Sequence, residues 1–402
     1  MLRMSVKNGE YIMVGDDVKI VFLGGCAGQT RIMVDAPKEI NIARSKAIEK
    51  RIEDPELLAK MPKFSLEELF LGDYTLDFET YVTDQFVLRD QWIALKTATD
   101  IALGKKDVGG VYLTKDGGLI EKHLPSDIDA TKAEEKVTLL SEMIEHYQEL
   151  GTFQNFHVML VPTADNIQTH RLPDFAQYFD QKAYIDHVEE AIGQEYLVDV
   201  WEILEENKQE YIYYLTDHHW TTQGAYLGYL KWADELGVTP VSFEGQTKEV
   251  LSNEFLGTLH SKTNLNLKPD VMEGYKLPED RTYEVYYDLS PSAKDSIYEE
   301  KYLSTKNKYG YFIDDNHGFV QIETGISNGK TLFVIKDSYA NCLVPFLTEH
   351  YETICIIDLR YCNISLYQLI DMAMETYVPG DEYDMLVLYN VIHFIEEFQY
   401  RK

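Results

Sequence analysis

Three nearly continuous apolar runs in the last third of the chain constrain the fold more than any other feature. They are Thr331–Ile335, Thr353–Asp358 and Met385–Tyr389, and helical stretches at Asn341–Tyr351 and Ser365–Thr376 separate them. Strands with apolar residues on both faces are typical of parallel sheets that are buried on both sides. The alternation of strand and helix therefore predicts an α/β domain of three layers around a parallel sheet.

Residues 66–402 are expected to form this one domain. Apolar residues recur at helical spacing in its amphipathic segments, and glycines at 151 and 237 follow two of these segments and end them. The further elements that we expect are helices at Tyr74–Ile101, Lys132–Leu150 and Thr222–Leu236 and strands at Phe156–Val161 and Tyr196–Trp201.

Residues 1–55 follow a different pattern, in which short β-prone runs alternate with turn-forming residues such as Gly24-Gly25. The expected strands are Leu2–Val6, Glu10–Val14, Val18–Leu23, Gln29–Val34 and Glu39–Ile42, with a helix at Arg44–Arg51. A segment of this size buries too little surface to be stable alone, so its free strand edges predict a homodimer. Residues 56–65 show no sustained periodicity and are interpreted as a linker.

The charged residues are distributed unevenly between the N-terminal segment and the larger domain. The net charge is −31, yet residues 1–53 hold nine Lys and Arg against seven Asp and Glu. A strongly acidic surface repels nucleic acid and anionic lipid, so we expect neither to bind the larger domain. The mildly basic N-terminal segment is therefore expected to have a different partner.

The sequence carries no pattern that is typical of export or membrane insertion. No early stretch has the organisation of a signal peptide, and no apolar run approaches the ~20 residues that span a bilayer. Four cysteines in 402 residues do not make a disulfide framework, which favours a reducing compartment. We therefore expect a cytoplasmic protein.

A specific combination of motifs occupies the N-terminal segment. The pattern G-E-x-I-x-x-G-D-D at Gly9–Asp17 is followed by A-P-K-E at Ala36–Glu39, with Arg31 between them and Arg44 beyond. This segment closely resembles the carbon storage regulator (CsrA/RsmA) family. The resemblance implies an interlocked β-sheet homodimer that binds GGA-containing mRNA loops and controls translation or mRNA stability.

The resemblance also implies which residues contact the RNA. The carried-over positions, together with one lysine that attracts phosphate, are Leu2, Arg3, Met4, Ser5, Val6, Lys7, Lys38, Ile42, Ala43 and Arg44. Sequence-specific readers of RNA take single-stranded loops, and a forked guanidinium suits a base or a phosphate. Val6 departs from the family, which usually has a basic residue there, so we expect one phosphate contact fewer. In the alternative interpretation, the arginines and lysines are only solvated surface charges.

A second constellation of reactive residues lies in the larger domain. Asp217 and His219 stand two positions apart, and Ser338 follows an apolar strand and precedes a helix. A serine, a histidine base and an orienting carboxylate form a nucleophilic triad, which is recognised by roles and not by chain order. In the alternative interpretation, Ser338 caps its own helix and Asp217 caps Thr222–Leu236.

The larger domain resembles the DHHW family, relatives of the alginate O-acetyltransferase proteins with a permuted SGNH-hydrolase fold. The matching pieces are Phe86–Asp90, Asp217–Trp220, Asn316-His317, Lys336–Leu347 and Asp358–Tyr361. The resemblance implies that Ser338 is the nucleophile, His219 the base and Asp217 the orienting acid. By position Asn390 is the expected oxyanion-hole residue, and Asn316 is its rival. His218 is then structural, and Trp220 either packs or stacks on a sugar ring.

These resemblances imply acyl transfer through an acyl-serine, without a cofactor or a metal. The expected substrate is a carbohydrate, and the expected partner is a membrane-bound O-acyltransferase, because relatives of this kind work with one outside the membrane. Three interpretations stay open. The chain is a post-transcriptional regulator with an added SGNH-like domain, a carbohydrate O-acetyltransferase or esterase with a regulatory segment, or a regulator fused to an inactive binding domain.

The Arg44 assignment can be tested directly. Arg44→Ala is expected to weaken binding of a GGA-containing RNA by about 1–3 kcal/mol, because a forked donor is lost. Filter binding at physiological salt measures the change. Unchanged affinity would contradict the assignment of this residue to the RNA site.

Overall fold

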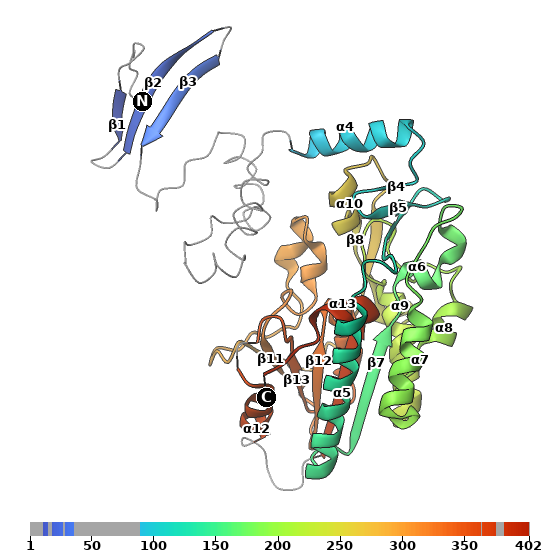
Figure 1. Ribbon diagram of the computed structural model, residues 1–402. Coiled ribbons are helices and arrows are strands. Elements are labelled where there is room, and N and C mark those ends of the chain that lie inside the picture. The colour runs from blue at the N-terminus through green and yellow to red at the C-terminus, as the bar shows by residue number, and fades with distance from the viewer. Residues whose placement is uncertain are drawn as a thin grey trace. The chain divides into compact units, whose positions relative to one another are not determined.

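The computed structural model describes the chain in six stretches (Figure 1). They are residues 11–14, 18–26, 29–35, 89–362, 364–374 and 382–401. The chain divides into two units, Met1–Arg89 and Asp90–Lys402, and each is described here by itself.

The N-terminal unit contains a three-stranded antiparallel sheet in the order β1-β2-β3. Its strands are β1 Tyr11–Val14, β2 Val18–Cys26 and β3 Gln29–Asp35, in good agreement with three of the predicted strands. The predicted turn at Gly24-Gly25 is wrong, because β2 continues through both glycines and only its register with β3 shifts after Phe22. Glycine tolerates such an irregularity within a strand.

The remaining predictions for this segment lie outside the described residues. They are the first and last strands, the helix, the linker and all of the RNA-contacting positions.

The C-terminal unit is built on a six-stranded sheet in the order β10-β11-β13-β12-β14-β7. The strands are β7 Asn155–Val161, β10 Glu284–Tyr287, β11 Phe319–Glu323, β12 Lys330–Lys336, β13 Thr353–Ile357 and β14 Glu382–Asn390. The four strands from β13 to β7 are parallel, as the apolar runs predict. The predicted parallel sheet is confirmed for these four strands, but the whole sheet is mixed, because β10 pairs antiparallel with β11 and β11 with β13. These two strands alternate buried with more exposed residues, a pattern that antiparallel strands tolerate.

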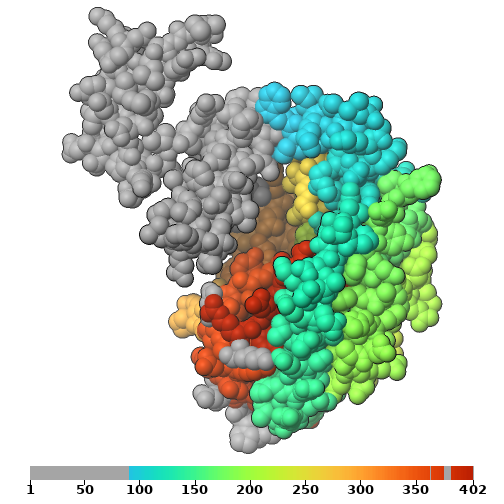
Figure 2. Space-filling view, in the orientation of Figure 1, coloured from blue at the N-terminus to red at the C-terminus, as the bar shows by residue number. Residues whose placement is uncertain are grey.

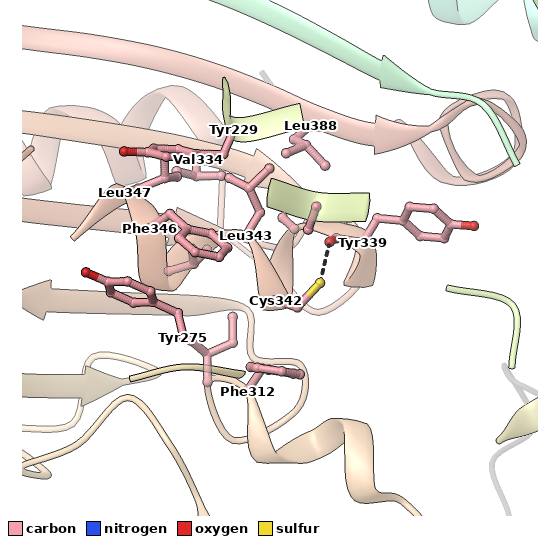
Figure 3. Packing of buried hydrophobic residues seen from close by; sticks show 14 of the residues in the cluster. Tyr229, Tyr275, Phe312, Val334, Tyr339, Cys342, Leu343, Phe346, Leu347 and Leu388 are labelled. Carbon is pink, nitrogen blue, oxygen red and sulfur yellow. Dashed lines mark hydrogen bonds between the residues drawn. The ribbon is translucent and has the colours of Figure 1, made fainter. Parts of the chain in front are cut away.

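Helices cover both faces of this sheet and make three layers (Figure 1). The helices on one face are α5 Ala130–Leu150, α7 Gln181–Ile192, α12 Leu366–Met374 and α13 Val391–Glu397. In the space-filling view α5, coloured teal, lies beside the red C-terminal elements (Figure 2). On the opposite face α9 Thr222–Leu236 and α11 Val344–Leu347 pack against the sheet. Val334 and Leu388 of two neighbouring strands meet Tyr229 and Phe346 there (Figure 3).

Smaller elements surround the sheet. Their helices are α4 Arg89–Ala102, α6 Ala164–Ile167, α8 Trp201–Glu206 and α10 Thr258–Thr263. Their strands are β4 Asp107–Val108, β5 Val111–Leu113, β6 Leu119–Glu121, β8 Lys248–Phe255 and β9 Asp270–Tyr275. The 3-10 helices are η1 Thr169–Arg171, η2 Gln194–Tyr196, η3 Gly245–Thr247, η4 Glu300–Ser304, η5 Lys308–Tyr311 and η6 Ser338–Cys342. No helix of the described stretches is long and apolar enough to cross a bilayer.

The glycine stops are confirmed, because Gly151 and Gly237 both end their helices in the left-handed conformation, at φ of 62° and 69°. The predicted strand at Tyr196–Trp201 is wrong. Only Leu197 bridges to β7, and the side chain of Asp199 accepts the backbone N–H of Trp201 at 2.8 Å where α8 begins.

The predicted helix at Asn341–Tyr351 is two shorter helices, η6 and α11. Pro345 stands in the first turn of α11, where a missing N–H is tolerated, but it cannot continue a helix from upstream. Of the predicted helix at Tyr74–Ile101, the described part runs from Arg89.

Leu388 tests the central packing, because it is fully buried between the sheet and the α9 layer. Leu388→Ala is expected to lower the free energy of unfolding of the C-terminal unit by about 2–5 kcal/mol. Urea denaturation followed by tryptophan fluorescence measures this unit, because all four tryptophans lie beyond residue 90. Leu150→Ala is the control, since Leu150 is largely exposed. Equal stabilities of the two variants would contradict the packing described here.

Candidate active site

Ser338 lies at the carboxyl edge of the parallel strands. It comes two residues after β12 and opens η6, so it occupies the edge where ligands of open α/β sheets bind. The interpretation of Ser338 as a cap is wrong. Asp337 is the N-cap residue, and its Oδ1 accepts the backbone N–H of Tyr339 at 2.9 Å. The hydroxyl of Ser338 is therefore available for another partner.

That partner is His219, which joins Ser338 to Asp217. Ser338 Oγ lies 2.8 Å from His219 Nε2, and His219 Nδ1 lies 2.6 Å from Asp217 Oδ1. A carboxylate beside Nδ1 selects the tautomer that donates from Nδ1 and accepts at Nε2. The predicted hydrogen-bonded chain is thus present, although 119 residues separate its serine from its histidine. All three side chains are buried.

Asp217 is held in place by the start of α10. Its Oδ2 accepts the backbone N–H of Thr258 at 2.8 Å and the Thr258 hydroxyl at 3.1 Å. A Cβ at Gly257 would meet the Asp217 carboxylate at 2.2 Å, so only glycine allows this approach. Asp217 does not cap α9, because Thr221 is the N-cap residue of that helix.

The electrostatics of the site favour an ionised Asp217. Burial by itself would raise the pKa of Asp217, but His219, through its charge and its hydrogen bond, and the backbone N–H of Thr258 bring it well below its usual range. Burial and the neighbouring charge of His219 lower the pKa of His218 to about 3. At neutral pH the site therefore holds a carboxylate beside a neutral His218.

Tyr309 of η5 fixes the plane of the His219 ring. The two rings stack with centroids 3.9 Å apart and an angle of 12° between their planes. The Tyr309 hydroxyl also donates to the backbone oxygen of Ser338 at 3.1 Å, so one side chain contacts both ends of the Ser–His pair. No pattern in the sequence indicated Tyr309, Gly257 or Thr258, because none of them lies within a recognisable motif.

The remaining residues of the Asp217–Trp220 motif connect it to the serine loop. Trp220 Nε1 donates to the backbone oxygen of Tyr339 at 2.8 Å, and the Tyr339 hydroxyl donates to that of His218 at 2.5 Å. Trp220 is fully buried, so the alternative in which it stacks on a sugar is wrong. His218 bonds the hydroxyl of Thr258 through Nδ1 at 2.7 Å, in keeping with a structural role.

The two asparagines proposed for the oxyanion hole have other partners. Asn390 caps α13, and its Nδ2 donates to Asp337 Oδ2 at 2.8 Å, which leaves one amide hydrogen for another acceptor. Asn316 Oδ1 accepts from Lys336 Nζ at 3.0 Å, and its Nδ2 donates to Asp315 at 2.8 Å. The role of Asn390 stays a prediction.

Within the described stretches, Asp217, His218 and His219 form a group whose ligand atoms lie within 4.8 Å of one another, close enough for a metal ion. Both ring nitrogens of His219 are already bonded, to Asp217 and to Ser338. A metal at this position would have to displace the Ser–His–Asp chain, so the geometry favours that chain.

Comparisons with known proteins identify relatives of the C-terminal unit. The DHHW protein family matches residues 104–357. A DHHW family protein from Eubacterium siraeum is 24% identical, with a TM-score of 0.59 over 72% of this chain and 93% of its own. Bacillus cereus PatB1, solved with a sulfonyl adduct, is 21% identical, with a TM-score of 0.56 over 73% of this chain and 97% of its own. At these identities the two structures share the fold.

The N-terminal segment has its own relatives. The global regulator protein family, CsrA, matches residues 1–53. The translational regulator CsrA of Hydrogenovibrio crunogenus is 40% identical over 48 residues, which are 12% of this chain and 69% of that protein. Its counterpart in Alkaliphilus oremlandii is 38% identical over 69 residues, 17% of this chain and 92% of that protein. The chain therefore belongs to the DHHW protein family and carries at its N-terminus a domain of the CsrA family of global regulators.

Proposed function

We propose that the C-terminal unit transfers or hydrolyses acetyl groups on carbohydrate, with Ser338 as its nucleophile. The observation that supports this most is the chain from Ser338 Oγ through His219 to the buried carboxylate of Asp217. Serine is a weak nucleophile at neutral pH and needs an adjacent base, which itself needs an orienting group. His219 is the proposed base, and Asp217 is the proposed orienting group.

In the proposed mechanism His219 transfers one proton in each half-reaction, from Ser338 to the departing oxygen and then from the acceptor to Ser338 Oγ. Ser338 Oγ attacks the acetyl carbonyl while His219 Nε2 takes the hydroxyl proton, and Asp217 stabilises the imidazolium. His219 then gives the proton to the departing oxygen, which leaves an acetyl-serine. A sugar hydroxyl or a water, deprotonated by His219, attacks this ester and restores Ser338. Asn390 is the proposed oxyanion donor, through its second amide hydrogen.

The N-terminal domain suggests a second function, binding of GGA-containing mRNA as a homodimer in the cytoplasm. Its match to the CsrA family over residues 1–53 favours this proposal.

One preparation of the full chain is enough to distinguish an enzyme from an inactive binding domain in the C-terminal unit. GGA-RNA binding and acetyl-ester turnover are measured on it side by side. RNA binding without turnover would leave the C-terminal unit as a binding domain.

Ser338→Ala is expected to reduce hydrolysis of 4-nitrophenyl acetate by at least about 10³-fold, because the nucleophile is lost. Its melting temperature should stay near that of the natural protein, since Asp337 and not Ser338 caps η6. Phenylmethylsulfonyl fluoride should label Ser338 in the natural protein, as mass spectrometry would detect. Ser304→Ala is the matched control, because Ser304 is exposed and bonds only its own 3-10 helix. Retained turnover in Ser338→Ala would remove this serine from the mechanism.

Asp217→Asn is expected to lower turnover by about 10⁴-fold, because the amide favours the wrong tautomer of His219. Stability gives an independent readout. The pKa of Asp217 is depressed in the folded protein, so its stabilising effect is present above the unfolded value of about 4 and is lost as pH falls below it. The stability advantage of the natural protein over Asp217→Asn should therefore shrink between pH 7 and pH 3 in urea denaturation. An advantage that is constant with pH would contradict an ionised Asp217.

A further inference from the structure

A second Asp–His pair lies beside the proposed triad. His393, in the first turn of α13, places Nδ1 2.9 Å from Oδ2 of Asp337, the residue that precedes Ser338. The backbone N–H of His393 donates to Asn390 Oδ1 at 2.9 Å. The ring is therefore held by the ends of β12 and β14, the same sheet edge that carries the serine.

The carboxylate that orients His393 is fully occupied. Asp337 Oδ2 also accepts the backbone N–H of Asn390 at 3.1 Å and its side-chain amide at 2.8 Å. Its Oδ1 accepts from Tyr339 N at 2.9 Å. A buried carboxylate with this many donors has one orientation, so the His393 ring has one orientation as well.

The ring of His393 lies close to the proposed triad, and its side chain is not fully buried. The His393 ring lies 6.0 Å from that of His218, which in turn lies 3.8 Å from the His219 ring. The His393 side chain keeps 22% of its surface exposed. Among the described residues, no group forms a hydrogen bond with its Nε2.

The charged groups around His393 favour its protonated form. The favourable charges are those of Asp337 at its Nδ1 and Glu397 one turn later on α13, whereas Arg360 opposes them and the neighbouring His218 is neutral. Burial would lower the pKa of His393, but the bond to Asp337 and the negative charges of Asp337 and Glu397 raise it above its usual value. Nε2 of the protonated ring then carries a hydrogen that no described residue accepts.

We infer that His393 binds the carbohydrate, by donating from Nε2 to an oxygen of the sugar next to the acetyl ester, and that Asp337 is its positioning residue. This inference rests on the proposed function. It accounts for the free nitrogen beside the triad, whereas a structural role in capping α13 is already filled by Asn390. One carboxylate thus sets both the loop that carries Ser338 and the ring that holds the sugar.

The test measures kcat/KM of the His393 variants for two esters, one on a sugar and one without a sugar. In His393→Phe, the kcat/KM for an acetylated xylo-oligosaccharide should fall about tenfold further than that for 4-nitrophenyl acetate, because one charged hydrogen bond to the sugar is lost. His393→Gln keeps a neutral donor, so it should recover part of the loss. KM of the natural protein for the sugar should rise as pH increases through the His393 titration, and KM of His393→Gln should not. His187→Phe is the control, since His187 is exposed and contacts Glu134 of α5.

A binding measurement that needs no turnover distinguishes a failure of this inference from a failure of the proposed function. Calorimetry of the same oligosaccharide with Ser338→Ala needs no turnover, and adding His393→Phe to it should raise Kd about tenfold. Turnover in the natural protein with no effect of His393→Phe on either ester would overturn the inference alone. Absent turnover with a raised Kd would overturn the acetyl-transfer proposal and keep the sugar site. Equal losses on both esters with a lower melting temperature would make His393 structural, and absent binding would overturn both.

Discussion

The proposed site depends on the hydrogen bonds that the buried carboxylate of Asp337 accepts. This carboxylate accepts hydrogen bonds from Tyr339, Asn390 and His393, and so it ties the end of β12 to the end of β14. An ionised carboxylate away from water is strongly unfavourable unless every lone pair is satisfied. The loop that carries Ser338 therefore has little freedom, because any other path would leave this group without partners.

Two further contacts bring the histidine to that loop. The DHHW motif and the serine loop exchange hydrogen bonds, since Trp220 donates to Tyr339 and Tyr339 donates to His218. Tyr309 then stacks on His219 and bonds the Ser338 backbone. Hydrogen bonds inside a buried, low-dielectric region are both stronger and more costly to leave unmade than those in water. The motif thus holds the serine loop in place and also supplies Asp217 and His219, two residues of the proposed triad.

The division of charge helps to separate the proposed functions. Residues 1–53 carry a net charge of +2, with nine Lys and Arg against seven Asp and Glu, so the rest of the chain carries −33. Phosphate contacts dominate the affinity of proteins for nucleic acid, and an acidic surface repels them. The negative charge of the residues beyond 53 therefore disfavours binding of RNA to that part of the chain. An uncharged carbohydrate is neither attracted nor repelled by this negative charge, so the charge is compatible with a sugar site on the acidic unit.

The sequence by itself determined most of the local elements of the C-terminal unit and pointed to the residues of the proposed triad. Continuous apolar runs mark strands buried on both faces, glycines after helices mark their ends, and a serine after a buried strand lies at the sheet edge. These signals are local, so they can be read without the fold. Only the tertiary structure decided that His219 Nε2 contacts Ser338 Oγ. It also decided that β10 and β11 run antiparallel and that Trp220 is buried. It also brought Tyr309, Thr258 and His393 to the site from separate segments, because contacts between distant residues depend on topology and leave no periodic trace in the chain.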